Sequence, residues 1–329
     1  MGKNRFFQRR RFLQGAAGLL LGGTLPSALV PVAAKAGNLT GEPLTTLIDV
    51  DACDGCGACV RACRDRNLEG VPLPVRQPPQ PYPSWIRIQD WSGKRDVTDR
   101  LTPYNWLYLQ SCTVQTEAGA RKVFLPRRCM HCINPPCANL CSTGAARQRA
   151  SGAVYIDHGS CMGDGQCDRA CPWMIPRRQS GVGPYLSFAP RYAGNGQMFK
   201  CDYCQDLLAE GKPPACIAAC PRQAQRIGPR KDMVRAARVM AEERKGDIFG
   251  LNENGGTNTL YVSSLAFRDM EAELLREDQI GYGRPSLRPA GASMDKENRL
   301  LGTVLLAPLA GAALAWLRIW REKQKRRRP

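Results

Sequence analysis

The stretch Cys53-Asp54-Gly55-Cys56-Gly57-Ala58-Cys59-Val60-Arg61-Ala62-Cys63 decides the fold of this chain. Its spacing, C-x2-C-x2-C-x3-C, is typical of loops that hold an iron–sulfur cluster through cysteine thiolates. Three thiolates must approach one cluster from one side, and Gly55 and Gly57 let the backbone wrap closely because they lack a Cβ atom. The fourth cysteine of such a run usually binds a second cluster, so the stretch predicts that partner groups exist elsewhere in the chain.

Three further cysteine groups follow. The second group is Cys129, Cys132, Cys137 and Cys141, the third is Cys161, Cys167 and Cys171, and the fourth is Cys201, Cys204, Cys216 and Cys220. Of the 16 cysteines in the chain, only Cys112 stands outside the four groups. It has no metal-binding spacing, so we expect a buried free thiol there.

The third group is one thiolate short. Asp164 stands where the regular spacing would have the second cysteine. The remaining cysteines and Asp164 together give sixteen ligand positions, enough for four iron–sulfur clusters. The sequence leaves three readings of the site open: a [4Fe-4S] cluster with Asp164 or water on one iron, a [3Fe-4S] cluster, or an aspartate that only caps the turn between Gly163 and Gly165.

Disulfides and structural zinc are the alternatives to iron. Disulfide frameworks need no strict two-residue spacing between cysteines. Structural zinc sites usually contain two separated cysteine pairs, and only the fourth group resembles that pattern. A zinc-stabilised envelope assembly protein is therefore kept as a second class, and the spacing favours iron–sulfur clusters.

Composition indicates an α+β fold that is rich in loops. The chain has 329 residues, 32 glycines, 25 prolines and only 7% aromatic residues, so we expect cluster binding to stabilise it more than a large apolar core. The net charge is +18, but residues 1–36 and residues 318–329 carry +6 each. Since the basic residues gather at the ends, the charge does not indicate nucleic-acid binding.

Both ends of the chain carry targeting signals. Residues 1–36 contain Arg9-Arg10-Arg11-Phe12-Leu13, then an apolar stretch and Ala34-Lys35-Ala36, which predicts a twin-arginine signal peptide. Residues 300–317 are uncharged and correspond to about 27 Å of helix, which predicts a transmembrane helix. Residues 318–329 are basic and predict a cytoplasmic tail, so the body should lie on the periplasmic side of the cytoplasmic membrane.

The chain between these signals divides by its cysteine groups. We expect cluster motifs I to IV over residues 44–73, 119–151, 152–181 and 198–228, then a C-terminal extension over 229–299. Strands are expected at residues 47–50, 85–88, 122–125 and 153–157, and helices at 206–211, 230–245 and 268–276. Residues 71–83 should form a proline-rich loop and residues 182–200 an irregular segment.

The order of the groups, the export signal and the C-terminal helix resemble a known family. Arg128-Cys129-Met130-His131-Cys132 and Gly255-Gly256-Thr257-Asn258-Thr259-Leu260-Tyr261-Val262 add to the similarity. The chain resembles the HybA-type four-cluster ferredoxin subunits of periplasmic [NiFe] hydrogenases, within the DmsB/NrfC/FdnH-like iron–sulfur subunits. That resemblance implies tandem bacterial 2[4Fe-4S] ferredoxin-like units.

The resemblance also implies how the ligands are shared among the clusters. Cys53, Cys56 and Cys59 would share a cluster with Cys220, and Cys63 would join Cys201, Cys204 and Cys216. Cys129, Cys132 and Cys137 would take Cys171, whereas Cys161, Asp164 and Cys167 would take Cys141. The chain departs from the family pattern at Asp164, so the last cluster is either [4Fe-4S] or [3Fe-4S]. His131 lies between two ligands, and it either tunes a cluster by hydrogen bonding or is a solvated loop residue.

The implied function is electron transfer in anaerobic respiration, without catalysis by this chain. The sequence has no evident nucleophile–base pair, phosphate loop or C-x-x-C-H haem motif. The clusters would carry electrons between a periplasmic catalytic subunit, a hydrogenase, and an integral membrane quinone-reactive subunit. The alternative is the same role beside a molybdopterin oxidoreductase of the formate, sulfur or tetrathionate type.

Overall fold

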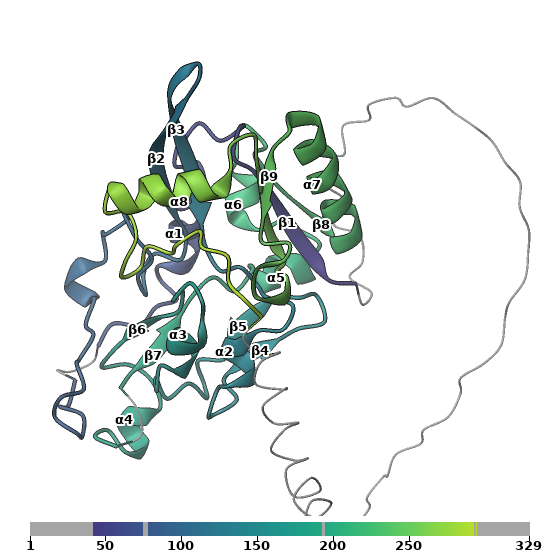
Figure 1. Cartoon of the computed structure of the whole chain (residues 1–329). Helices are drawn as coiled ribbons and strands as arrows, with labels where there is room; N and C mark the ends of the chain where they lie inside the picture. The colour runs from purple at the N-terminus through teal and green to yellow at the C-terminus, as the bar shows by residue number, and fades with distance from the viewer. Residues whose placement is uncertain (1–41, 75–77, 193–194, 293, 295–329) are drawn as a thin grey trace, which may run out of the picture. The chain divides into compact units, whose positions relative to one another are not determined.

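A computed structural model describes residues 42–74, 78–192, 195–292 and 294. In this part of the chain the strands form one four-stranded sheet and three two-stranded sheets, joined by short helices and long loops. Figure 1 shows the larger sheet and its helices in the upper half of the view and the small hairpins in the lower half. The mixed content of helix, strand and loop is the expected α+β architecture.

The four-stranded sheet joins the beginning of the described chain to its end. Its order is β8 (Gln225–Pro229), β1 (Leu44–Asp49), β10 (Thr259–Ser263) and β9 (Asp247–Phe249). Strands β1 and β10 are parallel, with Leu47 opposite Leu260, and both are buried because apolar residues cover both faces. The strand expected at residues 47–50 is thus confirmed, with its start three residues earlier.

Helix α7 (Arg230–Arg244) covers one face of this sheet (Figure 1). It follows Pro229, whose fixed φ suits the entry to a helix. Its apolar side chains, Ala237 and Ala241 among them, pack on Leu47, Leu260 and Val262. The expected helix over residues 230–245 is confirmed.

A long β-hairpin is the second large element of the fold. Strands β2 (Tyr108–Thr116) and β3 (Gly119–Arg127) pair in register, with Cys112 opposite Val123. Helix α8 (Phe267–Arg276) lies across the hairpin (Figure 1), and Met270 and Leu274 belong to the same buried cluster as Cys112. The expected strand at 122–125 and helix at 268–276 are confirmed, and Cys112 is a buried free thiol, 1% exposed.

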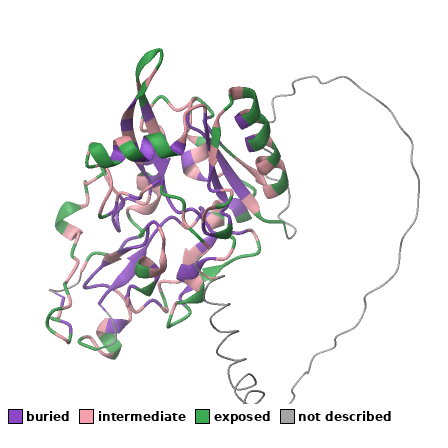
Figure 2. Ribbon diagram, viewed as in Figure 1, coloured by how far each residue is buried: buried purple, intermediate pink, exposed green. Residues whose placement is uncertain are grey.

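Two short hairpins frame the second and third cysteine groups. They are β4 (Ala146–Gln148) with β5 (Val154–Ile156), and β6 (Arg177–Gln179) with β7 (Gln197–Phe199). Figure 2 shows much of their length buried. The expected strand at 153–157 corresponds to β5. The remaining short elements are α1 (Ala58–Asn67), η1 (Ser92–Lys94), α2 (Pro136–Asn139), α3 (Gln166–Ala170), α4 (Tyr185–Phe188), α5 (Gln205–Ala209), α6 (Ala215–Ala218) and η2 (Glu253–Gly255).

Two expectations from the sequence are wrong. Residues 85–88 form no strand: the segment follows Pro83, and the Gln80 side-chain amide donates to the carbonyls of Ser84 and Ile86, as in a folded loop. Residues 182–200 are not irregular throughout, because they contain α4 and β7. The helix expected at 206–211 is present as α5, beginning and ending one to two residues earlier.

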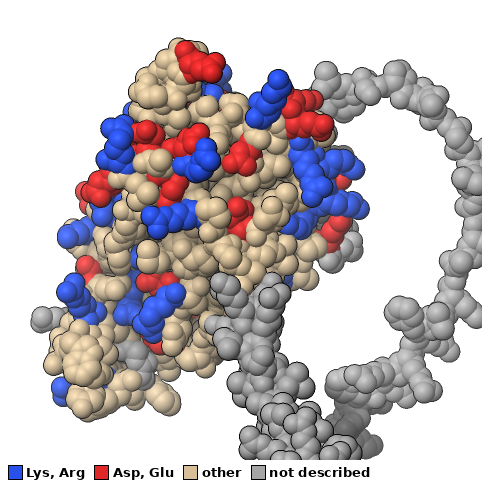
Figure 3. Space-filling model, in the orientation of Figure 1, with Lys and Arg blue, Asp and Glu red and all other residues tan. Residues whose placement is uncertain are grey.

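The predicted targeting signals belong to the two ends of the chain. The signal peptide of residues 1–36, the helix of residues 300–317 and the tail of residues 318–329 all lie outside the described residues. Among the described helices, none is long and apolar enough to cross a membrane. On the face in Figure 3, basic and acidic side chains alternate over the body of the protein.

Candidate iron–sulfur centres

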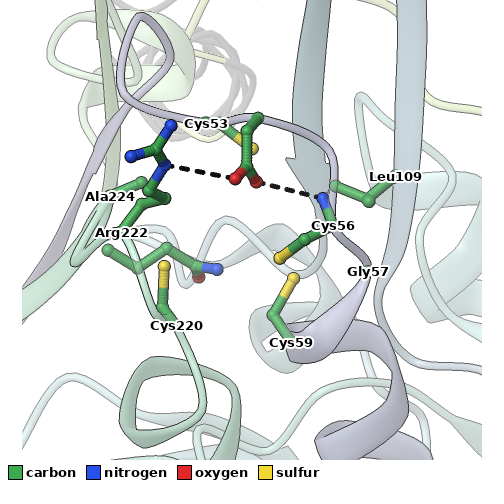
Figure 4. Close-up of a pocket in the computed structure, with 10 residues that line it drawn as sticks. Cys53, Cys56, Gly57, Cys59, Leu109, Cys220, Arg222 and Ala224 are labelled. Atoms are coloured by element: carbon green, nitrogen blue, oxygen red, sulfur yellow. Dashed lines mark hydrogen bonds and ion pairs between the residues drawn. The ribbon is translucent and has the colours of Figure 1, made fainter.

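The first set of thiols comes from two distant parts of the chain. Cys53, Cys56, Cys59 and Cys220 line one pocket, which is drawn in Figure 4. Cys56 and Cys59 point toward Cys220 across the pocket, and Cys220 lies just beyond α6. The structure therefore brings together the four cysteines that the resemblance assigns to one cluster.

Local backbone geometry explains how the first loop presents its thiols. Gly55 and Gly57 have φ values of 77° and 73°, the left-handed conformation that favours glycine. A Cβ atom on Gly55 would also lie 2.6 Å from the Phe124 ring. Helix α1 then carries Cys59 and Cys63 one turn apart, so one helix supplies thiols to two different sets.

Asp54 ties the loop to the chain segment that delivers Cys220. Its Oδ1 accepts a hydrogen bond from the backbone N–H of Cys56 at 3.1 Å, and its Oδ2 forms an ion pair with Arg222 Nε at 3.2 Å. Both interactions lower the pKa of Asp54, the Cys56 hydrogen bond most of all. The carboxylate thus remains charged and holds the two segments together.

The second set surrounds another pocket. Cys129, Cys132, Cys137 and Cys171 line it together with Lys200 and apolar residues such as Trp173. Burial, followed by the charge of the neighbouring Cys137, raises the pKa of Cys171 to about 12. A pocket of four buried thiols is a poor site for free thiolates, since their charges repel in a medium of low polarity.

In each of the other two sets, the cysteines lie close enough together to affect one another's pKa. Burial raises the pKa of Cys63, and Cys216 and Cys204 add to the effect. Burial raises the pKa of the Cys201 thiol, and the charge of Cys63 is among the other causes that raise it. In the last set, burial raises the pKa of Cys161, to which Cys141 and Asp164 contribute. The structure thus assembles Cys63 with Cys201, Cys204 and Cys216, and Cys141 with Cys161, Asp164 and Cys167.

Pairs of thiols from different sets define the order of the four sets. Cys59 packs in one buried cluster with Cys63 and Cys216, Cys201 packs in a second with Cys129 and Cys132, and Cys137 packs in a third with Cys161 and Cys167. The sets containing Cys53 and Cys161 are therefore the two ends of a row. The sets containing Cys63 and Cys129 lie between them.

The donor sets fit iron–sulfur clusters. Four cysteines line each of two cavities, which suits a multi-iron group that needs a thiolate on each iron. Within the described residues, no three His, Cys, Asp or Glu side chains converge on the position of a single metal ion. Two buried cations, Arg128 and Lys200, face the thiols and provide charge for anionic groups in this interior.

Asp164 occupies the ligand position, but its carboxylate has protein partners. Its Oδ1 accepts a hydrogen bond from the backbone N–H of Gln166 at 3.1 Å, and its Oδ2 accepts one from the Ser142 hydroxyl. The first contact is the turn-capping interaction considered from the sequence. Whether Asp164 also binds iron stays a prediction.

His131 is not a solvated loop residue: it is 0% exposed. Its Nδ1 accepts a hydrogen bond from the backbone N–H of Val154 at 3.0 Å, and its Nε2 lies 3.5 Å from Cys201 Sγ. Burial, followed by Lys200 and Arg128, holds the pKa of His131 well below its usual value. The neutral ring therefore carries its proton on Nε2 and donates it to the Cys201 sulfur.

Sequence reasoning missed three polar side chains around the thiols. Arg128 Nη1 donates to Cys216 Sγ at 2.8 Å, Asn67 Nδ2 lies 3.5 Å from Cys63 Sγ, and Lys200 Nζ donates to the Cys201 carbonyl at 3.0 Å. Burial alone would lower the pKa of Arg128, but the thiols of Cys216 and Cys201 raise it. The available signal was local, because Arg128 and Lys200 each directly precede a cysteine of a cluster group.

Comparisons with known proteins agree with this geometry. Two models of a 4Fe-4S dicluster domain match the chain, over residues 52–145 and residues 120–230. The Hydrogenase-2 operon protein HybA of Escherichia coli O157:H7 is 26% identical in an alignment of 309 positions that covers 83% of this chain and 86% of that protein. The iron-sulfur subunit of nitrate-inducible formate dehydrogenase from Escherichia coli (strain K12) is 30% identical over 225 residues, 66% of each chain.

Two further relatives define the extent of the similarity. The probable anaerobic dimethyl sulfoxide reductase chain YnfG of Escherichia coli (strain K12) is 31% identical over 186 residues, 56% of this chain and 73% of that protein. A relative from Nitratidesulfovibrio vulgaris is 31% identical over 268 residues, 79% of this chain. The match spans 65% of that relative's length.

The fold and the four sets of thiols define a protein of the multi-cluster ferredoxin class, with tandem 4Fe-4S ferredoxin-like domains. Within that class, the chain belongs to the family of HybA-type iron–sulfur subunits related to DmsB and FdnH. It is an electron-transfer subunit with four iron–sulfur clusters and is not itself a catalyst. The clusters accept and release single electrons, while the protein holds, insulates and tunes them.

Proposed function

We propose that this protein conducts electrons through a row of four clusters, each held by one of the four sets. The proposed ligands are Cys53, Cys56, Cys59 and Cys220; Cys63, Cys201, Cys204 and Cys216; Cys129, Cys132, Cys137 and Cys171; and Cys141, Cys161, Asp164 and Cys167. The observation that carries the proposal is the row of sets, in which cysteines of neighbouring sets pack in the same buried cluster. The proposed motif boundaries are residues 44–73, 119–151, 152–181 and 198–228, followed by an extension over 229–299.

Iron and acid-labile sulfide analysis tests this proposal. The full chain, purified anaerobically, should contain roughly sixteen irons, or one fewer if the cluster beside Asp164 has three irons. About eight irons in a fully loaded sample would contradict it. The broad visible absorption of iron–sulfur clusters also separates this proposal from a zinc-stabilised envelope protein.

The proposed partners are a periplasmic catalytic subunit and an integral membrane subunit that reacts with quinone. Similarity to a hydrogenase-2 operon protein over most of both chains supports a hydrogenase as the catalytic partner. Similarity to formate dehydrogenase and dimethyl sulfoxide reductase subunits supports the alternative, a molybdopterin oxidoreductase. Purification in mild detergent, followed by identification of the copurified large subunit, distinguishes the two.

The proposed location is the periplasmic side of the cytoplasmic membrane. It is supported by the twin-arginine pattern in residues 1–36, the apolar residues 300–317 and the basic residues 318–329. The double variant Arg9→Lys, Arg10→Lys should leave unexported precursor in the cell. Protease added to spheroplasts should digest the body of the wild type, and its protection would contradict this orientation.

A further inference from the structure

Arg128 is a buried cation without a carboxylate partner. Its side chain is 2% exposed, and among the described residues it takes part in no ion pair with Asp or Glu. Its Nε and Nη2 atoms are buried and have no hydrogen-bond partner within the part of the chain that the structure describes. An uncompensated guanidinium in an apolar interior destabilises a fold, so a negative group must lie beside it in the loaded protein.

The neighbours of Arg128 identify that negative group. Nη1 donates to Cys216 Sγ at 2.8 Å, and Cys201 is the next thiol whose charge acts on the guanidinium. Both cysteines belong to the set with Cys63 and Cys204. The other two buried arginines have different surroundings: Arg177 forms an ion pair with Asp168, and Arg127 donates to the Ser286 carbonyl and lies over two aromatic rings. Each of them also has a buried nitrogen without a hydrogen-bond partner among the described residues, but neither has a hydrogen bond to a thiol there.

The same set receives two neutral donors. Asn67 Nδ2 lies 3.5 Å from Cys63 Sγ, and His131 Nε2 lies 3.5 Å from Cys201 Sγ. The fourth sulfur, Cys204, has Arg66 as its side-chain donor, but Arg66 is partly exposed and already forms an ion pair with Asp206. Arg128 is therefore the one fully charged donor to this set that is buried and has no carboxylate partner among the described residues. Positive charge and hydrogen bonds to sulfur favour the reduced, more negative cluster and raise its reduction potential.

We propose that Arg128 is the internal counter-charge of the cluster held by Cys63, Cys201, Cys204 and Cys216, and that it sets this cluster's reduction potential above what its ligands alone would give. Reduction by a neighbouring cluster of the row would transfer one electron to this cluster, leave the donor cluster oxidised by one electron, and move no proton. The added negative charge is stabilised by the guanidinium at short range in a medium of low polarity. This inference rests on the proposed ligand sets, and it makes this inner cluster a preferred resting place for an electron in the row.

The test is a redox titration of the full chain in its membrane complex, followed by electron paramagnetic resonance. Cys216→Ser first identifies the signal of the cluster in question. In Arg128→Met, the ratio of reduced to oxidised cluster at a fixed potential should fall at least tenfold for that signal alone, a negative shift of about 59 mV or more for a one-electron couple. Arg128→Lys, which keeps the charge, should shift it much less than Arg128→Gln, which keeps a donor but loses the charge.

Arg127→Met is the matched control, since Arg127 is equally buried but contacts no sulfur. It should leave all four potentials unchanged. The wild type tests the proposed ligand sets separately from the role of Arg128. Four cluster signals in the wild type, with matching iron content, support the ligand sets whatever Arg128 does. If Arg128→Met does not load, the Lys and Gln variants decide. Equal potentials in those two variants and the wild type, or an equal shift in Arg127→Met, would overturn the proposal.

Discussion

Asp164 occupies in the third cysteine loop the position that Cys56 occupies in the first. Each lies between two left-handed glycines, with φ values of 68° and 77° around Asp164 and 77° and 73° around Cys56. A helix begins two residues later in both loops, at Gln166 and at Ala58. The two backbones therefore present an aspartate and a cysteine in the same way.

The first prediction concerns Asp164→Cys. A thiolate at this position would complete the set with Cys141, Cys161 and Cys167, so the variant should hold four [4Fe-4S] clusters. The wild-type carboxylate is engaged by Gln166 and Ser142, and a carboxylate binds iron less firmly than a thiolate, so we expect the wild-type site to rest as a [3Fe-4S] cluster. Oxidised wild-type protein should show a three-iron resonance that the variant lacks. Identical spectra with four four-iron clusters in both proteins would show that Asp164 has no special role.

The second prediction is the reciprocal change, Cys56→Asp. Since the loop geometry is shared, the first cluster should lose one iron and show a three-iron resonance of its own. Cys56 is the exposed thiol of its set, so the variant should fold with little change elsewhere. Iron analysis should find about one iron fewer per chain than in the wild type. Complete loss of the cluster at Cys53 would mean that the two loops are not equivalent as ligands.

The third prediction concerns Gly163→Ala. A Cβ atom there would lie 2.3 Å from the Gly196 carbonyl oxygen, so the loop would have to move and the cluster beside Asp164 should be lost. Gly144→Ala is the matched control, because Gly144 has a similar φ of 64° but open space around its Cβ position. That control should cost only about 1–2 kcal/mol of backbone strain and keep its iron. Equal iron content in the two variants would contradict the packing argument.

The fourth prediction concerns Cys112 and alkaline pH. Burial raises the pKa of this thiol from 9.0 to about 12, with Glu277 and Glu273 adding to the effect. The thiol stays neutral in the folded state and ionises earlier in the unfolded state. Its contribution to stability is therefore complete below pH 9 and is lost as the pH rises toward 12.

Cys112→Ala tests this contribution. The difference in free energy of unfolding between wild type and variant should shrink by up to about 1.4 kcal/mol for each pH unit above 9. Thermal midpoints measured anaerobically at several pH values give the comparison. Iron content should be equal in the two proteins, and iron loss in the variant would mean that Cys112 supports a cluster after all.

Spacing along the chain predicted the parts of the site that are local. The tight cysteine loops, the strand before the first loop and helix α7 depend on near neighbours in sequence. Arg128 reaches Cys216 across 88 residues, and His131 reaches Cys201 across 70 residues. Such contacts depend on which side chains the fold brings together, and a single sequence does not contain that information.

The wrong strand at residues 85–88 has a related cause. Its alternation of apolar and polar residues predicted pairing, but a strand also needs a neighbour that can satisfy its backbone groups. Gln80 satisfies two carbonyls in the loop, and Ile86 N–H donates to the Pro83 carbonyl within the same turn. The alternation therefore reflects a surface loop in which Trp85 is 79% exposed.

The pairing of β1 with β8 and β10 also sets the order in which a newly made chain can be completed. The proposed sets built on Cys129 and Cys141 have no ligand beyond Cys171, so all of their ligands are present while the rest of the protein is still being translated. Cys53 and Cys63 must wait for Cys220 and Cys216, and β1 must wait for β10, which ends at Ser263. If translation stops before residue 216, two of the proposed sets have all of their ligands, and the thiols of the other two sets lack their partner cysteines.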